Sequence, residues 1–209
     1  MTTDIDTIYV VDDDLGVGEA LSSFLRASGK DVRLFTSGAE FLSFERDDTP
    51  ACLILDLKMP GLNGLAVQRF VSATIPIIFI TGGCDVGSTV KAMKGGASDF
   101  LTKPVDEALL LAAVEHALDQ HRIARRDALH HANLLTRYRL LTPREQEVLP
   151  LLVQGRLNKQ IAAELGITEY TVQVHRGNIM RKMKADSFAA LVRLAESLSL
   201  NRSKPPSRK

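Results

Sequence analysis

Tryptophan is absent from the 209-residue sequence, and cysteine occurs only twice, at Cys52 and Cys84. Two cysteines that form no CxxC pair argue against a disulfide framework and a cysteine-based zinc site, and they fit a reducing cytoplasm. Aromatic residues make up 5% of the chain, and no row of them could stack RNA bases. The composition therefore favours a cytoplasmic protein and disfavours RNA as a partner.

Long hydrophobic runs are also missing. Uninterrupted apolar runs, such as residues 108–114, are far shorter than the ~20 residues of a membrane-spanning helix. Residues 1–6 are acidic and lack the apolar centre of a signal peptide. We therefore expect no membrane partner.

The small net charge of +1 hides an asymmetry along the chain. Residues 1–104 hold 14 acidic and 9 basic residues, whereas residues 142–209 hold 6 acidic and 12 basic residues. Opposite signs at the two ends predict two domains, of which the basic one attracts nucleic acid and the acidic one could hold a cation. Two solvated surfaces of different composition are the alternative.

The N-terminal half alternates between short apolar runs and segments with helical spacing. Such alternation predicts an α/β fold, with a buried parallel sheet and helices on both faces. Inward helix positions are predicted at Val67, Phe70 and Val71, and again at Val90 and Met93. The predicted strands include residues 8–11, 32–35, 52–55, 77–80 and 100–101.

Polar residues follow four of these five runs. Asp12-Asp13-Asp14, Asp56, Thr81 and Lys103 come after the first, third, fourth and fifth strands. The carboxyl ends of parallel strands share one edge of the sheet, so these side chains should converge there. An oxygen-only cluster favours Mg²⁺ or Mn²⁺. A carboxylate beside such an ion can form an aspartyl-phosphate, while Lys103 neutralises the phosphoryl charge.

Residues 8–104 resemble the receiver domain of two-component response regulators. The motifs Val10-Val11-Asp12-Asp13, Leu55-Asp56-x-x-Met59-Pro60-Gly61, Ile80-Thr81-Gly82 and Asp99-Phe100-Leu101-Thr102-Lys103-Pro104 carry the resemblance. It implies a (βα)5 doubly wound domain with strand order 2-1-3-4-5, which we place at residues 1–121.

The resemblance also implies a role for each residue of the edge. Asp56 would accept phosphate from a sensor histidine kinase, and Asp12 and Asp13 would hold the metal together with Asp56 and the backbone carbonyl of Lys58. Thr81, Gly82 and Lys103 would bind the phosphoryl group. Thr81 and Phe100 would act as the conformational switch, and the Lys103–Pro104 bond would be cis.

Two other interpretations of the N-terminal half remain. Asp12-Asp13-Asp14 contains the DxD pattern of haloacid-dehalogenase-type phosphatases, although Leu15-Gly16 follow it instead of Thr or Val. A receiver that dimerises without phosphorylation is the second alternative. Cys84 lies close to the predicted site, where it is either incidental or a redox sensor.

Residues 106–136 predict one helix or two stacked helices, because glycine and proline are absent from this stretch. Its stripe of Ala108, Leu111, Val114 and Leu118 should pack on the sheet. We assign residues 122–136 to a linker helix. The helix carries four histidines that we expect in solvated positions: His116, His121, His130 and His131.

The C-terminal part predicts a compact bundle of four helices. Thr142, Pro143 and Glu145 form the start signal of its first helix, a capping box. A second helix spans residues 158–165, and a third runs from the capping residue Thr168 to residue 183. Two short helices around a turn with glycine form a helix-turn-helix. A fourth helix should begin at residue 186 or 187.

This part resembles the LuxR-type helix-turn-helix, in its FixJ-like branch. Leu141-Thr142-Pro143-Arg144-Glu145, Asn158-Lys159-Gln160-Ile161-Ala162 and residues 171–183 carry the match. A helix of this kind docks in the major groove, where Gln173 and Asn178 could pair with adenine and Val174 could touch a thymine methyl. The predicted DNA contacts are Lys159, Thr171, Gln173, Val174, Arg176, Gly177, Asn178 and Arg181.

The sequence thus predicts a non-enzymatic transcription regulator of the LuxR/FixJ-like two-component family. Its α/β receiver would be followed by the linker helix, an all-α DNA-binding domain at 137–200 and a disordered basic tail at 201–209. The expected partners are a sensor histidine kinase, double-stranded DNA, a second copy of the phosphorylated chain and RNA polymerase. A basic helical bundle that contacts protein is the alternative for the C-terminal part.

Overall fold

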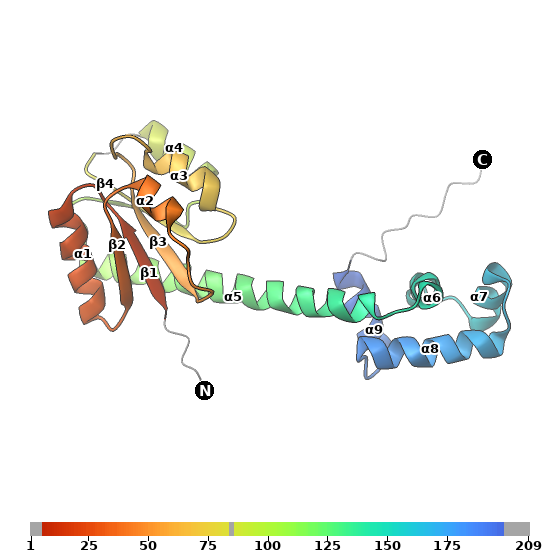
Figure 1. Cartoon of the computed structure of the whole chain (residues 1–209). Helices are drawn as coiled ribbons and strands as arrows, with labels where there is room; N and C mark the ends of the chain where they lie inside the picture. Colours follow the sequence, from red (N-terminus) through yellow and green to blue (C-terminus); the bar gives the residue numbers. More distant parts are fainter. Residues whose placement is uncertain (1–5, 84–85, 199–209) are drawn as a thin grey trace. The chain divides into compact units, whose positions relative to one another are not determined.

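The computed structural model describes residues 6–83 and 86–198. Cys84 and the tail at 201–209 lie outside the described residues. The chain divides into two compact units, residues 1–125 and 126–209 (Figure 1). No helix within the described ranges is long and apolar enough to cross a membrane.

The first unit contains a parallel sheet of five strands in the order β2-β1-β3-β4-β5, as predicted. Every residue of β1, β3 and β4 is buried, because helices cover both faces of the sheet. The strands are β1 (Thr7–Val11), β2 (Asp31–Phe35), β3 (Ala51–Asp56), β4 (Ile77–Thr81) and β5 (Asp99–Thr102).

The helices of the first unit form two layers around this sheet. Leu25 of α1 and Leu110 of α5 belong to the apolar core on one face, whereas Phe41 of α2, Val67 of α3 and Ala92 of α4 belong to the core on the other. The helices are α1 (Leu15–Ala27), α2 (Gly38–Ser43), α3 (Gly64–Val71), α4 (Val86–Lys94) and α5 (Glu107–Arg139).

Three predicted inward stripes were wrong in part or in whole. Phe70 is 69% exposed, and Val90 and Met93 are 45% and 46% exposed. Ala92 is the buried residue of α4, so this helix rests on the sheet through a small side chain and turns its larger apolar residues outward. In α5 the buried stripe contains Val114 and Leu118, as expected, but it begins at Leu110, while Ala108 is exposed.

The connector is one continuous helix, α5, which has 33 residues. Its histidines do not all lie in solvent, as we had expected. His121 is half-buried, and its Nδ1 accepts a hydrogen bond from the Ala51 N–H at 2.8 Å. This bond attaches α5 to the amino end of β3.

The second unit contains four further helices around one apolar core, as predicted. Thr142 and Glu145 form the expected capping box, and Thr168 and Ser187 cap the third and fourth helices of the bundle. Gly166 has the left-handed conformation (φ 65°) that lets the chain turn between α7 and α8. These helices are α6 (Pro143–Val153), α7 (Asn158–Leu165), α8 (Glu169–Met183) and α9 (Phe188–Ser197).

Candidate functional site: an acidic cluster at the strand ends and the exposed face of α8

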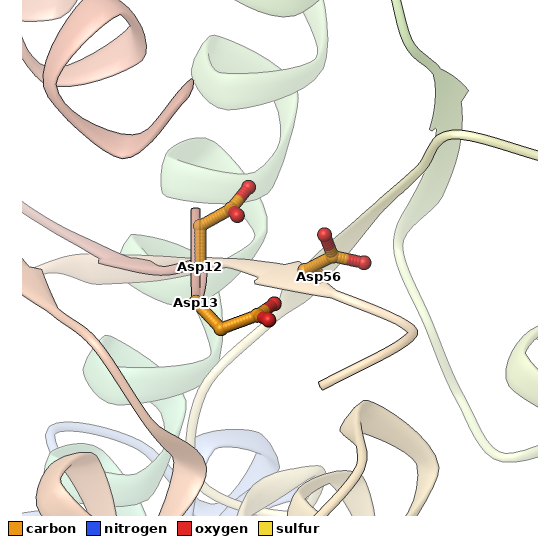
Figure 2. Close-up of side chains that lie close together, drawn as sticks. All are labelled: Asp12, Asp13 and Asp56. Carbon is orange, nitrogen blue, oxygen red and sulfur yellow. The ribbon is translucent and has the colours of Figure 1, made fainter. Parts of the chain in front are cut away.

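Three aspartates meet at the carboxyl edge of the sheet. Asp12 and Asp13 follow β1, and Asp56 ends β3 (Figure 2). One carboxylate oxygen from each lies within 4.8 Å of the others. Asp12 and Asp56 are 2% and 7% exposed, whereas Asp13 faces solvent. The edge therefore holds two buried carboxylates beside an open one.

Lys103 joins the two buried carboxylates. Its Nζ donates to Oδ2 of Asp12 at 2.7 Å and to Oδ2 of Asp56 at 2.6 Å. The Lys103–Pro104 bond that follows is cis, as the resemblance implied. Burial lowers the pKa of Lys103, but its bonds to the two aspartates outweigh burial and raise that pKa. Lys103 is therefore a cation at neutral pH.

Burial has the opposite effect on Asp12. It raises the pKa of the Asp12 carboxyl, although Lys103 and the Asp14 N–H stabilise the charged form. The remaining oxygens of the pair also have partners: the Asp14 N–H donates to Oδ1 of Asp12 at 3.0 Å, and the Lys58 N–H donates to Oδ1 of Asp56 at 2.9 Å. The backbone thus fixes the orientation of both carboxylates.

The third aspartate of the run has a structural role. Asp14 is the N-cap of α1, where its side chain accepts hydrogen bonds from the N–H groups of Gly16 and Val17. Two of the three consecutive aspartates therefore belong to the cluster, and the third orients the helix that follows.

Thr81, which ends β4, is fully buried. Its hydroxyl donates to the carbonyl of Gly83 at 3.4 Å, a weak bond that little energy would break. Phe100 on β5 is half-buried against the core on the α3 and α4 face. Gly82 lies in open space, because a Cβ added there would meet no atom within 4 Å.

The Lys58 side chain is a feature of the site that the sequence interpretation missed. Its ammonium nitrogen lies 3.6 Å from the position of a Cβ built on Gly83. A second cation besides Lys103 therefore borders the loop after β4. Lys58 lies two residues after Asp56, so its side chain could have been expected near the site. The resemblance assigned a role only to its backbone carbonyl.

The cluster is compatible with a divalent cation. Asp12, Asp13 and Asp56 offer three carboxylate oxygens, the hard donors that such ions prefer, and close carboxylates repel one another unless a cation lies between them. Nitrogen and sulfur ligands are absent from this group of three.

The second candidate surface is the outer side of α8, the second helix of the helix-turn-helix. Gln173, Val174, Gly177 and Arg181 are exposed there. A hydrogen bond of 3.3 Å joins Arg181 to Oδ1 of Asn178. Thr171 and Asn178 are half-buried, and Lys159 is exposed on α7.

Two basic residues of α8 have partners inside the bundle. The guanidinium of Arg176 lies 4.9 Å from the ring centre of Phe188, a cation–π contact that fixes its position. Lys182, near the end of the same helix, donates to the buried carboxylate of Glu145 at 2.6 Å. Lys182 therefore stabilises the bundle.

Comparison with known families decides what this pair of units is. Residues 8–115 match the response regulator receiver domain, and residues 139–195 match the bacterial regulatory proteins of the luxR family. The chain belongs to the FixJ-like response regulators. The DxD pattern of Asp12 to Asp14 lies within the receiver match, which favours the receiver over the phosphatase interpretation.

Several relatives align with most of this chain and with most of their own length. Nodulation protein W of Bradyrhizobium diazoefficiens is 44% identical over 93% of this chain and 87% of its own. Response regulator protein TodT of Pseudomonas putida is 48% identical over 91% and 86%. Transcriptional regulatory protein FixJ of Rhizobium meliloti is 39% identical over 90% and 94%.

Two solved structures of response regulators are similar to most of this chain. Response regulator StyR is 45% identical, with a TM-score of 0.82 over 91% of this chain and 98% of its own. Full-length FixJ from B. japonicum is 36% identical, with a TM-score of 0.53 over 93% and 97%. A receiver joined to a LuxR-type domain makes this response regulator a two-component transcription regulator, and this pair of domains implies a kinase and DNA as partners.

Proposed function

We propose that Asp56 accepts a phosphoryl group from a sensor histidine kinase and that this modification controls DNA binding. The bridge from Lys103 to Asp12 and Asp56 carries the proposal, because it places an ammonium group within hydrogen-bond distance of the phosphoacceptor oxygen. A cation in that position stabilises a phosphoryl group on Asp56.

Asp12, Asp13, Asp56 and the backbone carbonyl of Lys58 would hold Mg²⁺ or Mn²⁺. When bound, the ion supplies positive charge next to the transferred phosphoryl group. Its binding also relieves the repulsion between three carboxylates whose oxygens lie within 4.8 Å of one another.

The Thr81 hydroxyl, the Gly82 N–H and the Lys103 ammonium would bind the phosphoryl oxygens. Thr81 then exchanges its 3.4 Å bond to the Gly83 carbonyl for a stronger bond to an anion. Phe100, half-buried on the adjacent strand, moves into the space that Thr81 leaves. These two side chains transmit the modification from the edge of the sheet to α4 and β5.

Dimerisation is the proposed result of this movement. Val86, Val90 and Met93 form an exposed apolar stripe on α4, and they are 72%, 45% and 46% exposed. A second copy of the chain would cover this stripe once α4 has shifted. A change from 1:99 to 99:1 in favour of the dimerising state needs roughly 5.5 kcal/mol of differential stabilisation, which a few charge-assisted hydrogen bonds supply.

In the dimer, two α8 helices would read neighbouring major grooves, and bound RNA polymerase would be a further partner. We also propose that residues 122–136 form a linker between a receiver domain at residues 1–121 and a DNA-binding domain at residues 137–200. Thr171, Gln173, Val174, Gly177 and Asn178 would face the bases. Lys159, Arg176 and Arg181 would contact phosphates.

Acetyl phosphate with Mg²⁺ tests the proposal on the full chain. The native protein should become phosphorylated, form a dimer with a correspondingly higher mass in solution, and bind DNA more tightly. Asp56→Asn should lose all three responses, whereas Asp31→Asn, a change at an exposed aspartate of β2, should keep them. Full dimerisation and DNA binding by treated Asp56→Asn would show that the receiver acts without phosphorylation.

A further inference from the structure

A cleft lies at the amino-terminal edge of the sheet, at the end opposite to the acidic cluster. It has a volume of about 530 Å³, within the range of small-molecule sites. The segment before β3, the residues just before β4 and the last receiver turn of α5 form its walls. The residues that matter for its chemistry are Tyr9, Phe44, Arg46, Ile75 and Arg125.

Tyr9 is a polar residue that the fold leaves unsatisfied. Its side chain is fully buried, and its hydroxyl has no hydrogen-bond partner within the part of the chain that the structure describes. Burial raises the pKa of this hydroxyl above its usual value, although Arg33, Arg46 and the nearby Asp47 N–H, which does not reach hydrogen-bond geometry, act in the opposite direction. The hydroxyl therefore keeps its proton at neutral pH, and a buried donor of this kind requires an explanation.

Arg46 supplies a positive charge beside Tyr9. Its guanidinium lies 5.7 Å from the ring centre of Phe41 and donates to the Thr74 hydroxyl at 3.3 Å. Among the described residues, no carboxylate oxygen lies within 4 Å of it. A half-buried guanidinium with a neutral partner retains most of its capacity for an anion.

The two aspartates of the cleft are already neutralised. Asp47 pairs with Arg33 at 2.7 Å, and Asp48 pairs with Arg125. These pairs leave Arg46 as the cation available to a ligand. Phe44 and Ile75 add apolar surface to the same walls.

We propose that this cleft binds a small organic carboxylate with an apolar body. The Arg46 guanidinium and the Tyr9 hydroxyl would bind the carboxylate, while the ring or chain of the ligand packs against Phe44 and Ile75. The site is independent of Asp56. Through Arg125 and His121 it contacts α5, the helix that continues into the second unit.

Titration of the full chain with sodium benzoate, followed by calorimetry and by amide chemical shifts, tests the proposal. Benzoate should bind saturably and shift amides of residues 44–51 and 74–77. Benzyl alcohol, which lacks the charge, and acetate, which lacks the apolar body, should each bind about tenfold more weakly. Tighter binding of inorganic phosphate than of benzoate would overturn the assignment to organic carboxylates.

Two variants identify the binding groups. Arg46→Gln and Tyr9→Phe should each weaken benzoate binding by about tenfold, and Tyr9→Phe keeps the buried ring so that the fold is preserved. Arg69→Gln, a change at an exposed arginine of α3, should bind like the native chain. Equal binding by all four proteins, or no saturable binding to the native chain, would refute the site.

Discussion

The ammonium of Lys182 donates a hydrogen bond to the carboxylate of Glu145 at 2.6 Å, and Glu145 is 2% exposed. The bond joins α8 to α6. The same carboxylate accepts the Thr142 N–H at 2.8 Å, so one side chain caps α6 and anchors α8. The position of α8, whose exposed face we propose to bind DNA, therefore depends on a buried ion pair.

Lys182→Met should destabilise the second unit by about 3 kcal/mol, because it leaves the Glu145 carboxylate buried without its cation. Glu147→Gln, in which the altered residue is exposed and pairs with Arg144, should change stability by less than about 0.5 kcal/mol. Native-state hydrogen exchange of amides in α6 and α8 measures this unit separately. Equal protection in the two variants would contradict a stabilising role for the pair.

The same pair predicts a pH dependence. Burial raises the pKa of the Glu145 carboxyl, but the bonds from Lys182 and the Thr142 N–H outweigh it and hold that pKa below the ordinary 4.5. The unfolded chain therefore takes up the proton first, so the contribution is complete above pH 4.5 and is lost as the pH falls below it. In Glu145→Gln, the exchange-derived stability of α6 should lose this part of its acid dependence.

His121 gives a second, separate pH dependence in the first unit. Burial and the nearby Arg125 lower the pKa of its ring below 6.5. The Nδ1 of this ring accepts the Ala51 N–H. The unfolded state binds the proton more tightly, so stability is full above about pH 6.5 and falls as the pH drops from there toward the folded pKa.

His121→Phe should therefore cost about 1–2 kcal/mol at pH 8, where the Ala51 N–H loses its acceptor, and should flatten the pH profile of the first unit between pH 7 and 5. His116→Gln, at an exposed position of the same helix, is the control. Hydrogen exchange of β3 amides provides the measurement. An unchanged pH profile in His121→Phe would assign the dependence to other groups.

Gly64 packs tightly against the end of β3. A Cβ at this position would lie 2.4 Å from the carbonyl oxygen of Asp56 and 2.9 Å from the ring of Phe79. Gly64→Ala should therefore destabilise the first unit by about 1–3 kcal/mol and slow acetyl-phosphate labelling, because the end of β3 must shift.

Gly83→Ala is the matched control for this substitution, since its Cβ would meet Lys58 Nζ at an ordinary 3.6 Å. Equal unfolding midpoints for the two variants would show that β3 and α3 separate at little cost. Chemical denaturation followed by tyrosine and phenylalanine signals of the first unit distinguishes the outcomes.

The sheet and the acidic cluster were predictable because their causes are local. Apolar runs of four residues define buried strands, and residues directly after such runs share one edge of a parallel sheet, which is why Asp12, Asp56, Thr81 and Lys103 could be placed together. The helix caps at Thr142 and Thr168 were predictable for the same reason.

The errors concern contacts between elements. Helical spacing placed Val90 and Met93 inward, but α4 packs through Ala92 and leaves them exposed. His121 was expected in a solvated position, and nothing in the sequence marks Lys182 as a buried partner. Only the positions of Ala51 and Glu145 in space give these two side chains structural partners. Hydrophobic periodicity shows that one face of a helix is apolar, but the neighbouring elements determine which face is buried.

We propose that α8 makes base contacts and phosphate contacts, and the loss of each kind should affect DNA binding differently. Gln173 is exposed and neutral, so Gln173→Ala should weaken binding to preferred sites and relax base preference at one position, at a cost of about 1–3 kcal/mol. Arg181→Ala should weaken binding to all sequences alike and reduce the salt slope by about 1, because a phosphate contact releases a counterion.

Selection from random-sequence DNA with the phosphorylated full chain, followed by anisotropy titrations at several salt concentrations, separates these effects. Arg193→Ala on α9 is the control for loss of an exposed charge. If Gln173→Ala kept the native base preference, the bases would be read by another surface. If Arg181→Ala kept the native salt slope, its hydrogen bond to Asn178 would be its main role, and Arg176, which Phe188 holds in place, would be the phosphate contact to test in its stead.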